Sequence, residues 1–228
     1  MPVDTQLSVR EVADRLGVTP AAVRHRIAGG ELPAVKHGRD WWISERDVSR
    51  IGRRHDGPGQ PVAPAMAWAI LSLASADEAA VRRLLPHPRY RARARAWLRD
   101  HRLTTDAGRL RSRAIRANYE GHPSELARLR GRSDVLLTGV SAIEVVGIVG
   151  QSSTAELYAP TGRRGTIIAE HVLAPGPGNV IMRWIPDDVW VALDPHGHIA
   201  PRSAVLLDLV EGDDPRGRRE ALVALEAL

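Results

Sequence analysis

Apolar residues recur at helical spacing near the start of the chain. A polar pair precedes them: Ser8 and Glu11 are placed to bond each other's free backbone amides, which is a capping box. Gly17 then ends the pattern. The sequence therefore predicts a first helix whose inner face consists of Val9, Val12, Ala13 and Leu16.

A second helix is predicted directly afterwards. Thr19 suits the N-cap, Pro20 suits the first helical position, and Gly29-Gly30 marks the end. Val23 and Ile27 are four residues apart and form the inner face. The outer face combines small residues with arginine, which suits insertion into the major groove of DNA. We expect the DNA contacts of this helix to come from Thr19, Ala21, Arg24, His25 and Arg26.

Two short strands with a basic connection are predicted next, over residues 32–36 and 41–43. The connection forms a wing, from which Lys36 and Arg39 are expected to reach phosphates or the minor groove. A third helix follows, with capping and apolar positions at Ser44, Asp47, Val48 and Ile51.

These elements resemble a known family in the segment LSVREVADRLGVTPAAVRHRIAGGELPAVKHGRDWWISERDV. The segment is similar to the winged helix-turn-helix of the MerR/excisionase superfamily at nearly every structural position. The resemblance implies that residues 1–52 form a DNA-binding domain. A helical hairpin that serves only for packing is the alternative.

Residues 53–64 are rich in Gly and Pro, without periodicity, and are predicted to be a flexible linker. Helical spacing returns from Ala65, and we expect the larger domain to occupy residues 65–228. Apolar stripes predict three helices, and a fourth is expected over residues 110–119. The residues of the three stripes are Met66, Ile70 and Leu73; Val81, Leu84 and Leu85; and Tyr90, Ala94, Trp97 and His101.

The net charge of +5 is unevenly distributed. Residues 82–132 hold fifteen arginines against four acidic residues, whereas residues 133–228 carry a net charge of −6. This partition predicts either a polyanionic partner for the basic helical part or pairing between the two blocks. Solvated helix faces are the alternative. We expect five of these arginines to contact phosphates, which we favour, or an acidic partner. They are Arg91, Arg95 and Arg99, which form one row on a helix, and Arg111 and Arg113.

The last hundred residues mix strands with helices. Strands are predicted over 135–138, 154–158, 179–185 and 189–193, and helices begin near Ser141, Pro201 and Asp214. Strands that do not alternate regularly with helices indicate an α+β fold. We therefore expect an N-terminal winged helix-turn-helix, a helical middle and a C-terminal mixed α/β domain.

Segments between residues 105 and 228 resemble the C-terminal domain of AbiEi-type antitoxins. They are RLRSRAIRANYEGHPSELARL, VLLTGVSAIEVVGI, AELYAP, NVIMRWIP and APRSAVLLDLVEGDDPRGRREAL. The resemblance implies an antitoxin-like domain whose partner is a nucleotidyltransferase toxin of a type IV (abortive-infection) toxin–antitoxin pair. The excisionase-type winged helix in front departs from the common pattern of that family.

The sequence gives little support for a catalytic or metal-binding site. The chain has no Cys, which excludes disulfides, thiolate zinc sites and Cys nucleophiles. Gly139-Val140-Ser141-Ala142-Ile143 lacks the final Gly of a nucleophile elbow, and Asp194 with His196 and His198 fits a turn better than a metal site. We expect no enzyme, metal or cofactor. Without a visible signal peptide or a long apolar stretch, a cytoplasmic, nucleoid-associated protein is expected.

The leading hypothesis is a sequence-specific repressor that acts as the antitoxin of a toxin–antitoxin operon and autoregulates its promoter. It would bind double-stranded DNA with repeated half-sites as a homo-oligomer. The alternatives are a ligand- or partner-responsive MerR-like regulator without a toxin, and a recombination directionality factor.

Overall fold

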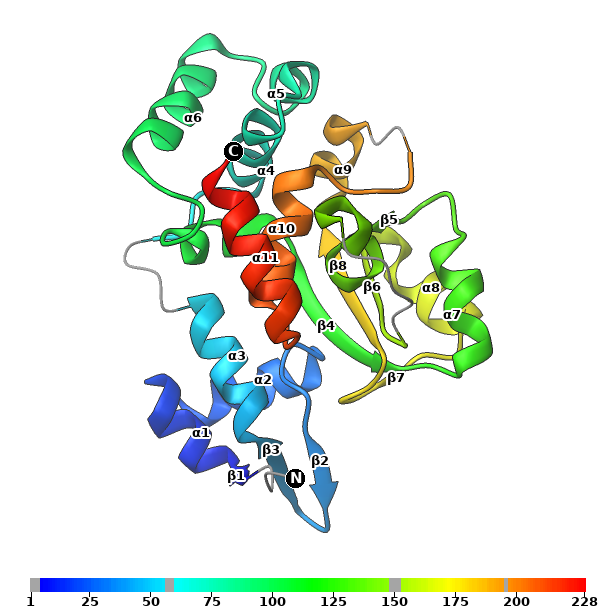
Figure 1. The fold of residues 1–228 in the computed structure, drawn as a ribbon. Helices are drawn as coiled ribbons and strands as arrows, with labels where there is room; N and C mark the ends of the chain where they lie inside the picture. Colours follow the sequence, from blue (N-terminus) through cyan, green and yellow to red (C-terminus); the bar gives the residue numbers. More distant parts are fainter. Residues whose placement is uncertain (1–4, 56–59, 148–152, 195–196) are drawn as a thin grey trace.

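The N-terminal unit combines three helices with a small sheet (Figure 1). The computed structural model describes residues 5–55, 60–147, 153–194 and 197–228. The strands pair antiparallel in the order β1-β3-β2, which confirms the helix-turn-helix and its wing. The elements are β1 (Gln6–Ser8), α1 (Val9–Leu16), α2 (Pro20–Ala28), β2 (Val35–His37), β3 (Asp40–Ser44) and α3 (Glu45–His55).

The apolar positions of this unit meet in a core of their own. The inner faces predicted for the first two helices are present in it, joined by Ile43 from the wing and Val48 from α3. A core of this size buries little apolar surface. Its buried residues are Val9, Val12, Ala13, Val23, Ile27, Leu32, Ile43, Val48 and Ile51.

Three helices form the next part of the chain, and α4 is the most buried. It is apolar on nearly all sides and therefore lies inside the larger core rather than on its surface. The Trp68 indole donates a hydrogen bond of 2.8 Å to the carbonyl of Arg113 and meets the Tyr158 ring edge-on. The helices are α4 (Pro64–Ala74), α5 (Glu78–Leu84) and α6 (Pro88–Asp100).

The larger domain is organised around a five-stranded sheet in the order β5-β6-β8-β4-β7. The two central strands β6 and β8 are parallel, and the remaining pairs are antiparallel. The chain thus mixes helices and strands, as the α+β prediction expects. The strands are β4 (Ile115–Glu120), β5 (Leu136–Leu137), β6 (Ala155–Pro160), β7 (Ala174–Pro175) and β8 (Val180–Ile185).

The two faces of this sheet differ in chemistry because side chains alternate along a strand. One face is apolar and packs against α7 and α8, while the other carries Glu156 and Arg183, and Arg183 reaches Asp208 and Glu211 of α10. The remaining elements are α7 (Pro123–Arg130), α8 (Arg164–Glu170), α9 (Asp187–Leu193), α10 (Arg202–Glu211), α11 (Pro215–Glu226) and the 3₁₀ segments Ala107–Arg113, Gly139–Val146 and Thr161–Arg163.

Several predicted elements are wrong. Residues 110–119 are not one helix: a 3₁₀ segment ends at Arg113 and β4 follows, because the sheet supplies partners along Ile115–Tyr119. Residues 189–193 belong to α9 rather than to a strand, since Pro186 and two aspartates begin a helix there. Ser141 caps no helix; its hydroxyl accepts a hydrogen bond of 2.8 Å from the Glu156 amide.

The predicted linker is bounded by ordered chain on both sides. Helix α3 extends to His55, and residues 56–59 lie outside the described part of the chain. Both backbone groups of Val62 are hydrogen-bonded: its amide donates to the Arg109 carbonyl over 3.0 Å, and its carbonyl accepts from the Ser112 hydroxyl. Among the described residues, none of the helices combines the length and apolar character needed to cross a membrane.

Candidate nucleic-acid interface

Hydrogen bonds of the side chains fix the starts of both helices of the helix-turn-helix. The Ser8 amide donates to Glu11 over 2.7 Å, and the Glu11 amide returns a bond of 3.4 Å to the Ser8 hydroxyl. The bonds from the Ser8 hydroxyl and amide lower the pKa of Glu11. Thr19 accepts from the Ala22 amide over 3.2 Å, and Gly17, at φ +62°, makes the turn between the helices.

The outer face of α2 is open to solvent at its N-terminal end. Thr19, Ala21, Arg24 and His25 are exposed and Arg26 is half-buried, as expected of a helix that enters a groove. Within the described chain, the Arg24 guanidinium makes no ion pair. Arg24 is therefore available for a bidentate bond to a base or a phosphate.

The wing carries the second group of expected contacts. Gly38, at φ +63°, turns β2 into β3, and the two strands pair from Val35–Trp42 to His37–Asp40. Lys36 lies 5.7 Å from the centre of the Trp41 ring, and Arg39 is exposed at the tip. Arg39 thus lies in the turn beyond the strand ends, whereas Lys36 lies within β2, opposite Trp41.

The larger domain holds the opposite end of α2. The Gly29 carbonyl accepts a bond of 3.0 Å from Arg164, and the Gly30 carbonyl accepts one of 2.8 Å from the Asn118 amide. These contacts leave the N-terminal end of α2 uncovered. Sequence reasoning missed Asn118 and Arg164, because Gly29-Gly30 showed only where a helix ends.

The row of arginines on α6 is partly engaged by the chain itself. Arg95 donates to both carboxylate oxygens of Glu78, over 2.8 and 3.0 Å, and Arg91 donates to the backbone carbonyls of Leu85 and Pro86. Arg99 is exposed. Arg111, which is half-buried, donates to the Gly108 carbonyl over 2.9 Å.

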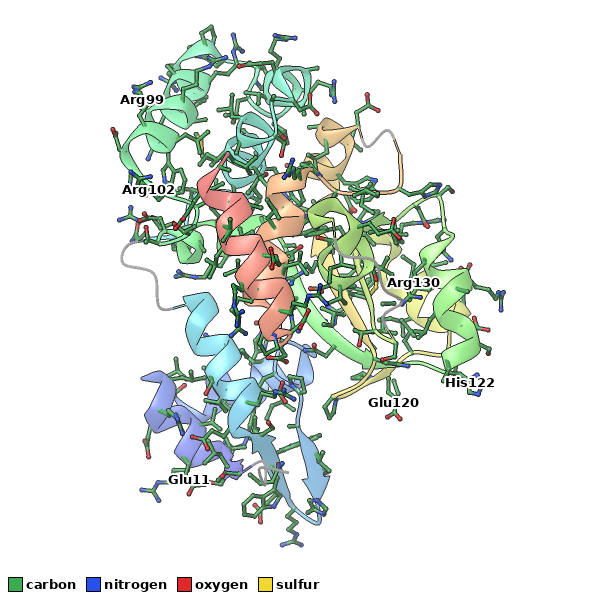
Figure 2. The ribbon with its side chains drawn as sticks, in the orientation of Figure 1. Glu11, Arg99, Arg102, Glu120, His122 and Arg130 are labelled. Carbon is green, nitrogen blue, oxygen red and sulfur yellow. The ribbon has the colours of Figure 1, made fainter. Side chains whose placement is uncertain are left out.

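The position of α6 in the fold bears on whether these arginines can contact DNA. Figure 1 shows α6 at the end of the molecule opposite the helix-turn-helix. In Figure 2, Arg99 and the adjacent Arg102 point outward at that end, while Glu11 marks the helix-turn-helix at the other. The prediction that α6 follows the DNA backbone rested on its closeness to the wing along the chain, and the fold separates the two.

Arg113 corrects an expectation, since the fold buries it completely. Its guanidinium donates to Asp208 and Glu211, each over 2.7 Å, and to the Tyr158 hydroxyl over 3.1 Å. Burial opposes its charge, yet Glu211, Tyr158 and Asp208 together raise the pKa of Arg113 well above its usual value. Burial also raises the pKa of the Tyr158 phenol. Arg113 is thus a structural residue and contacts neither DNA nor a partner.

A second buried arginine completes this cluster. Arg183 lies 3.3 Å from Asp208 and 3.1 Å from Glu211, and it also pairs with Glu156. Burial opposes its charge, but Asp208, Glu156 and Glu211 raise the pKa of Arg183. Two guanidiniums therefore meet three carboxylates between the sheet and α10.

The weaker chemical alternatives gain no support from their geometry. Asp194 is the C-cap of α9, at φ +48°, while His196 lies outside the described residues. Searched over the described ranges alone, the His, Asp and Glu side chains form no group of three that would hold a metal ion. Gly139 lies directly against the Glu156 carboxylate, where a Cβ atom would overlap it. The turn at Ser141 is thus built around Glu156.

Comparison with known proteins supports a helix-turn-helix in the N-terminal unit. A family model described as a helix-turn-helix domain matches residues 7–51. The probable plasmid-partitioning protein ParA of Thermus thermophilus is 47% identical over 45 residues. That stretch covers 20% of this chain and 14% of the Thermus protein. No solved structure matches the chain. Residues 7–51 of this chain are therefore a helix-turn-helix domain.

Proposed function

We propose that this protein is a sequence-specific DNA-binding repressor that autoregulates its promoter. The observation that carries the proposal is the uncovered N-terminal end of α2, with exposed Arg24 beside a cationic wing, on a domain matched as a helix-turn-helix. Among the described residues, Arg164 and Asn118 of the larger domain bind the chain at Gly29 and Gly30, at the end of α2 opposite the exposed residues proposed to contact DNA.

In the proposed complex, α2 lies in the major groove. Arg24 bonds a base edge, while Lys36 and Arg39 contact phosphates or the minor groove on the flank. One such unit covers only a half-site, so at least two chains bind an operator with a repeated sequence. The name of the Thermus relative, a probable plasmid-partitioning protein, fits a domain type that acts on DNA.

The proposed second activity is that of an antitoxin, with an acidic nucleotidyltransferase toxin as the partner. It is supported by the AbiEi-like segments and by the cationic end of the molecule around α6, where Arg99 is exposed. Because that end lies away from the helix-turn-helix, a partner there leaves α2 free for DNA (Figure 1). We propose no catalytic role for the chain.

The function is tested by selecting binding sites for the full-length protein from random duplex DNA. The selected sites are then footprinted, and the mass of the complex is measured. The expected result is a repeated motif bound by at least two chains and present in the protein's own promoter. Failure to enrich any motif would contradict the repressor, and a single chain on an unrepeated site would contradict the proposed assembly.

The antitoxin is tested separately by co-expression with any nucleotidyltransferase encoded next to this gene. The proposal expects that the full-length protein restores growth to cells that express the transferase. It also expects that changing Arg99 and Arg102 to Gln weakens this protection while operator binding is unchanged. Growth arrest that persists with the wild-type protein would contradict the antitoxin role and leave the repressor intact.

A further inference from the structure

A groove with a volume of about 760 Å³ lies along one side of α6. Tyr90, Arg93 and Trp97 follow one another at intervals of three and four residues, so their side chains share the face of α6 that lines the groove. The other walls come from the start of α4, from residues 60–63 before it and from the ends of neighbouring segments. The residues proposed to contact DNA lie outside this lining.

The lining of the groove is mainly apolar. Met66, Leu85 and Trp97 belong to the larger core and also line the groove. Tyr90 is 40% exposed, which is high for a large aromatic side chain. Apolar surface that stays exposed in a folded protein often marks a site of interaction. The other apolar residues of the lining are Pro61, Val62, Ala63, Ala65 and Ala96.

Arginines without an acidic partner lie in and beside this lining. Arg93 belongs to it, while Arg89, Arg99 and Arg102 are each adjacent in the chain to one of its residues. Over the described part of the chain, none of these four arginines forms an ion pair with a carboxylate. Arg99 and Arg102 are exposed and point outward in Figure 2.

The nearby carboxylates do not cancel this positive charge. Among the described residues, Asp100 is the one carboxylate of the lining. Glu78 on α5 is already paired with Arg95, and Asp106 is already paired with Arg109. Four arginines without an acidic partner therefore face one aspartate, and such a surface attracts an acidic partner.

The aromatic side chains favour a protein over a nucleic acid as that partner. Proteins that bind single-stranded nucleic acids stack the bases on open aromatic faces. Here the Arg89 guanidinium lies over the Tyr90 ring, 4.6 Å from its centre. The His101 ring stacks on Trp97 at 4.7 Å, with 7° between the two planes. One face of each ring is thus already occupied, whereas the aliphatic lining suits the apolar side chains of a protein.

We propose that this groove binds an acidic, amphipathic segment of a partner protein. Large apolar side chains of the segment would enter the groove, and its Asp or Glu side chains would pair with Arg89, Arg93 and Arg99. The site rests on the proposed antitoxin function, because it would hold the acidic partner proposed for this end of the molecule. Its chemistry can nevertheless be measured without a toxin.

The site is tested with the full-length protein and a library of random peptides displayed on phage. The expected result is enrichment of peptides that combine Asp or Glu with large apolar residues. The best peptide is then labelled with fluorescein, and its affinity is measured by fluorescence anisotropy. Changing its acidic residues to their amides, or its large apolar residues to Ala, should in each case weaken binding by at least about tenfold.

Two pairs of variants locate the bound peptide. Ala96→Glu adds a carboxylate to the lining and should weaken the acidic peptide by at least about tenfold, whereas Ala92→Glu, at an exposed position of the same helix outside the lining, should not. Arg93→Gln should weaken the peptide roughly two- to fivefold, the usual effect of one exposed ion pair. Arg24→Gln, at the opposite end of the molecule, should have no effect (Figure 1). The Arg93 pair keeps the test decisive if Ala96→Glu fails to fold.

Four results would overturn the proposal. The first two are a selection without enriched peptides and an enriched set without acidic residues. The third is a peptide affinity that Ala96→Glu and Arg93→Gln leave unchanged. The fourth is a different occupant: a uridine oligonucleotide that displaces the peptide and binds more tightly, or self-association of the protein that Ala96→Glu abolishes.

The co-expression test separates this site from the antitoxin function itself. If the wild type restores growth and Ala96→Glu does not, while Ala92→Glu does, the partner uses the groove. Protection that Ala96→Glu leaves intact would overturn the site and leave the antitoxin function standing. Growth arrest that persists with the wild type would contradict the antitoxin function but not a site located with the peptides.

Discussion

Replacing Arg113 with Met should destabilise the protein severely, although the residue comes from a stretch of exposed-looking arginines. Its side chain is 0% exposed and donates to two carboxylates over 2.7 Å. Arg113→Met would remove the guanidinium that donates to both Asp208 and Glu211, so the buried cluster would lose one positive charge and keep all three carboxylates. Breaking a buried pair from one side costs about 3–5 kcal/mol of unfolding free energy.

The assay is urea unfolding of the full-length chain, followed by circular dichroism. Arg99→Met is the matched control, because it removes the same charge from an exposed site and should change the free energy of unfolding by no more than ~0.5 kcal/mol. The double variant Arg113→Met/Glu211→Gln should recover part of the loss, since it removes one of the two negative charges that Arg113 neutralises. A loss below ~1 kcal/mol in Arg113→Met would refute the structural role of the buried cluster.

Two further predictions concern other charged groups. A hydrogen bond from Arg132, and a second from Arg163, lower the pKa of Asp134 from 3.8 to about 2. The ionised Asp134 therefore stabilises the folded state above pH ~4, and this stability is lost as the pH falls towards ~2. In Asp134→Asn, the free energy of unfolding should consequently decrease less between pH ~4 and pH ~2 than in the wild type. Urea titrations that give the same pH dependence for both proteins would contradict this. Changing Arg91, Arg95 and Arg99 together to Gln should leave the salt dependence of operator binding unchanged, because α6 lies at the end of the molecule opposite the helix-turn-helix. A log–log salt slope reduced by about three units would instead show that these arginines contact DNA phosphates.

The helix-turn-helix could be predicted from sequence because its signals are local. The capping box of Ser8 and Glu11, the cap at Thr19 and the glycine at 17 each lie within a few residues of what they determine. The helices consequently begin and end where those residues indicate. How this unit docks could not be predicted, since Asn118 and Arg164 lie 88 and 135 residues away from the carbonyls that they bind.

The arginine-rich block shows the limit of charge patterning. Arg99 and Arg113 stand in similar arginine-rich runs, yet one is exposed and the other is fully buried. The difference comes from Asp208 and Glu211, which lie 95 and 98 residues after Arg113. Pairing between the basic block and the acidic C-terminal part was one of the two predictions, and Arg113, Arg83 with Asp194, and Arg132 with Glu170 follow it.

The wrong strand and helix assignments have a different cause. The predicted helix 110–119 divides into a 3₁₀ segment and the strand β4, and the predicted strand 189–193 is helical; over such short stretches an apolar pattern fits a strand and a helix about equally well. In β4 the neighbouring strand β8 decides the outcome by pairing along its length. In α9 the helix start after Pro186 decides it.

DNA reading by α2 is tested by the effect of Arg24→Ala on binding to the selected operator and to a scrambled duplex of equal length. If α2 reads the major groove, the variant should lose about 1–3 kcal/mol on the operator and much less on the scrambled duplex. Arg39→Ala should instead weaken both duplexes alike and reduce the salt slope by roughly one unit, and Arg99→Ala should change neither. If Arg24→Ala bound the operator as tightly as the wild type does, α2 would not read the major groove through Arg24.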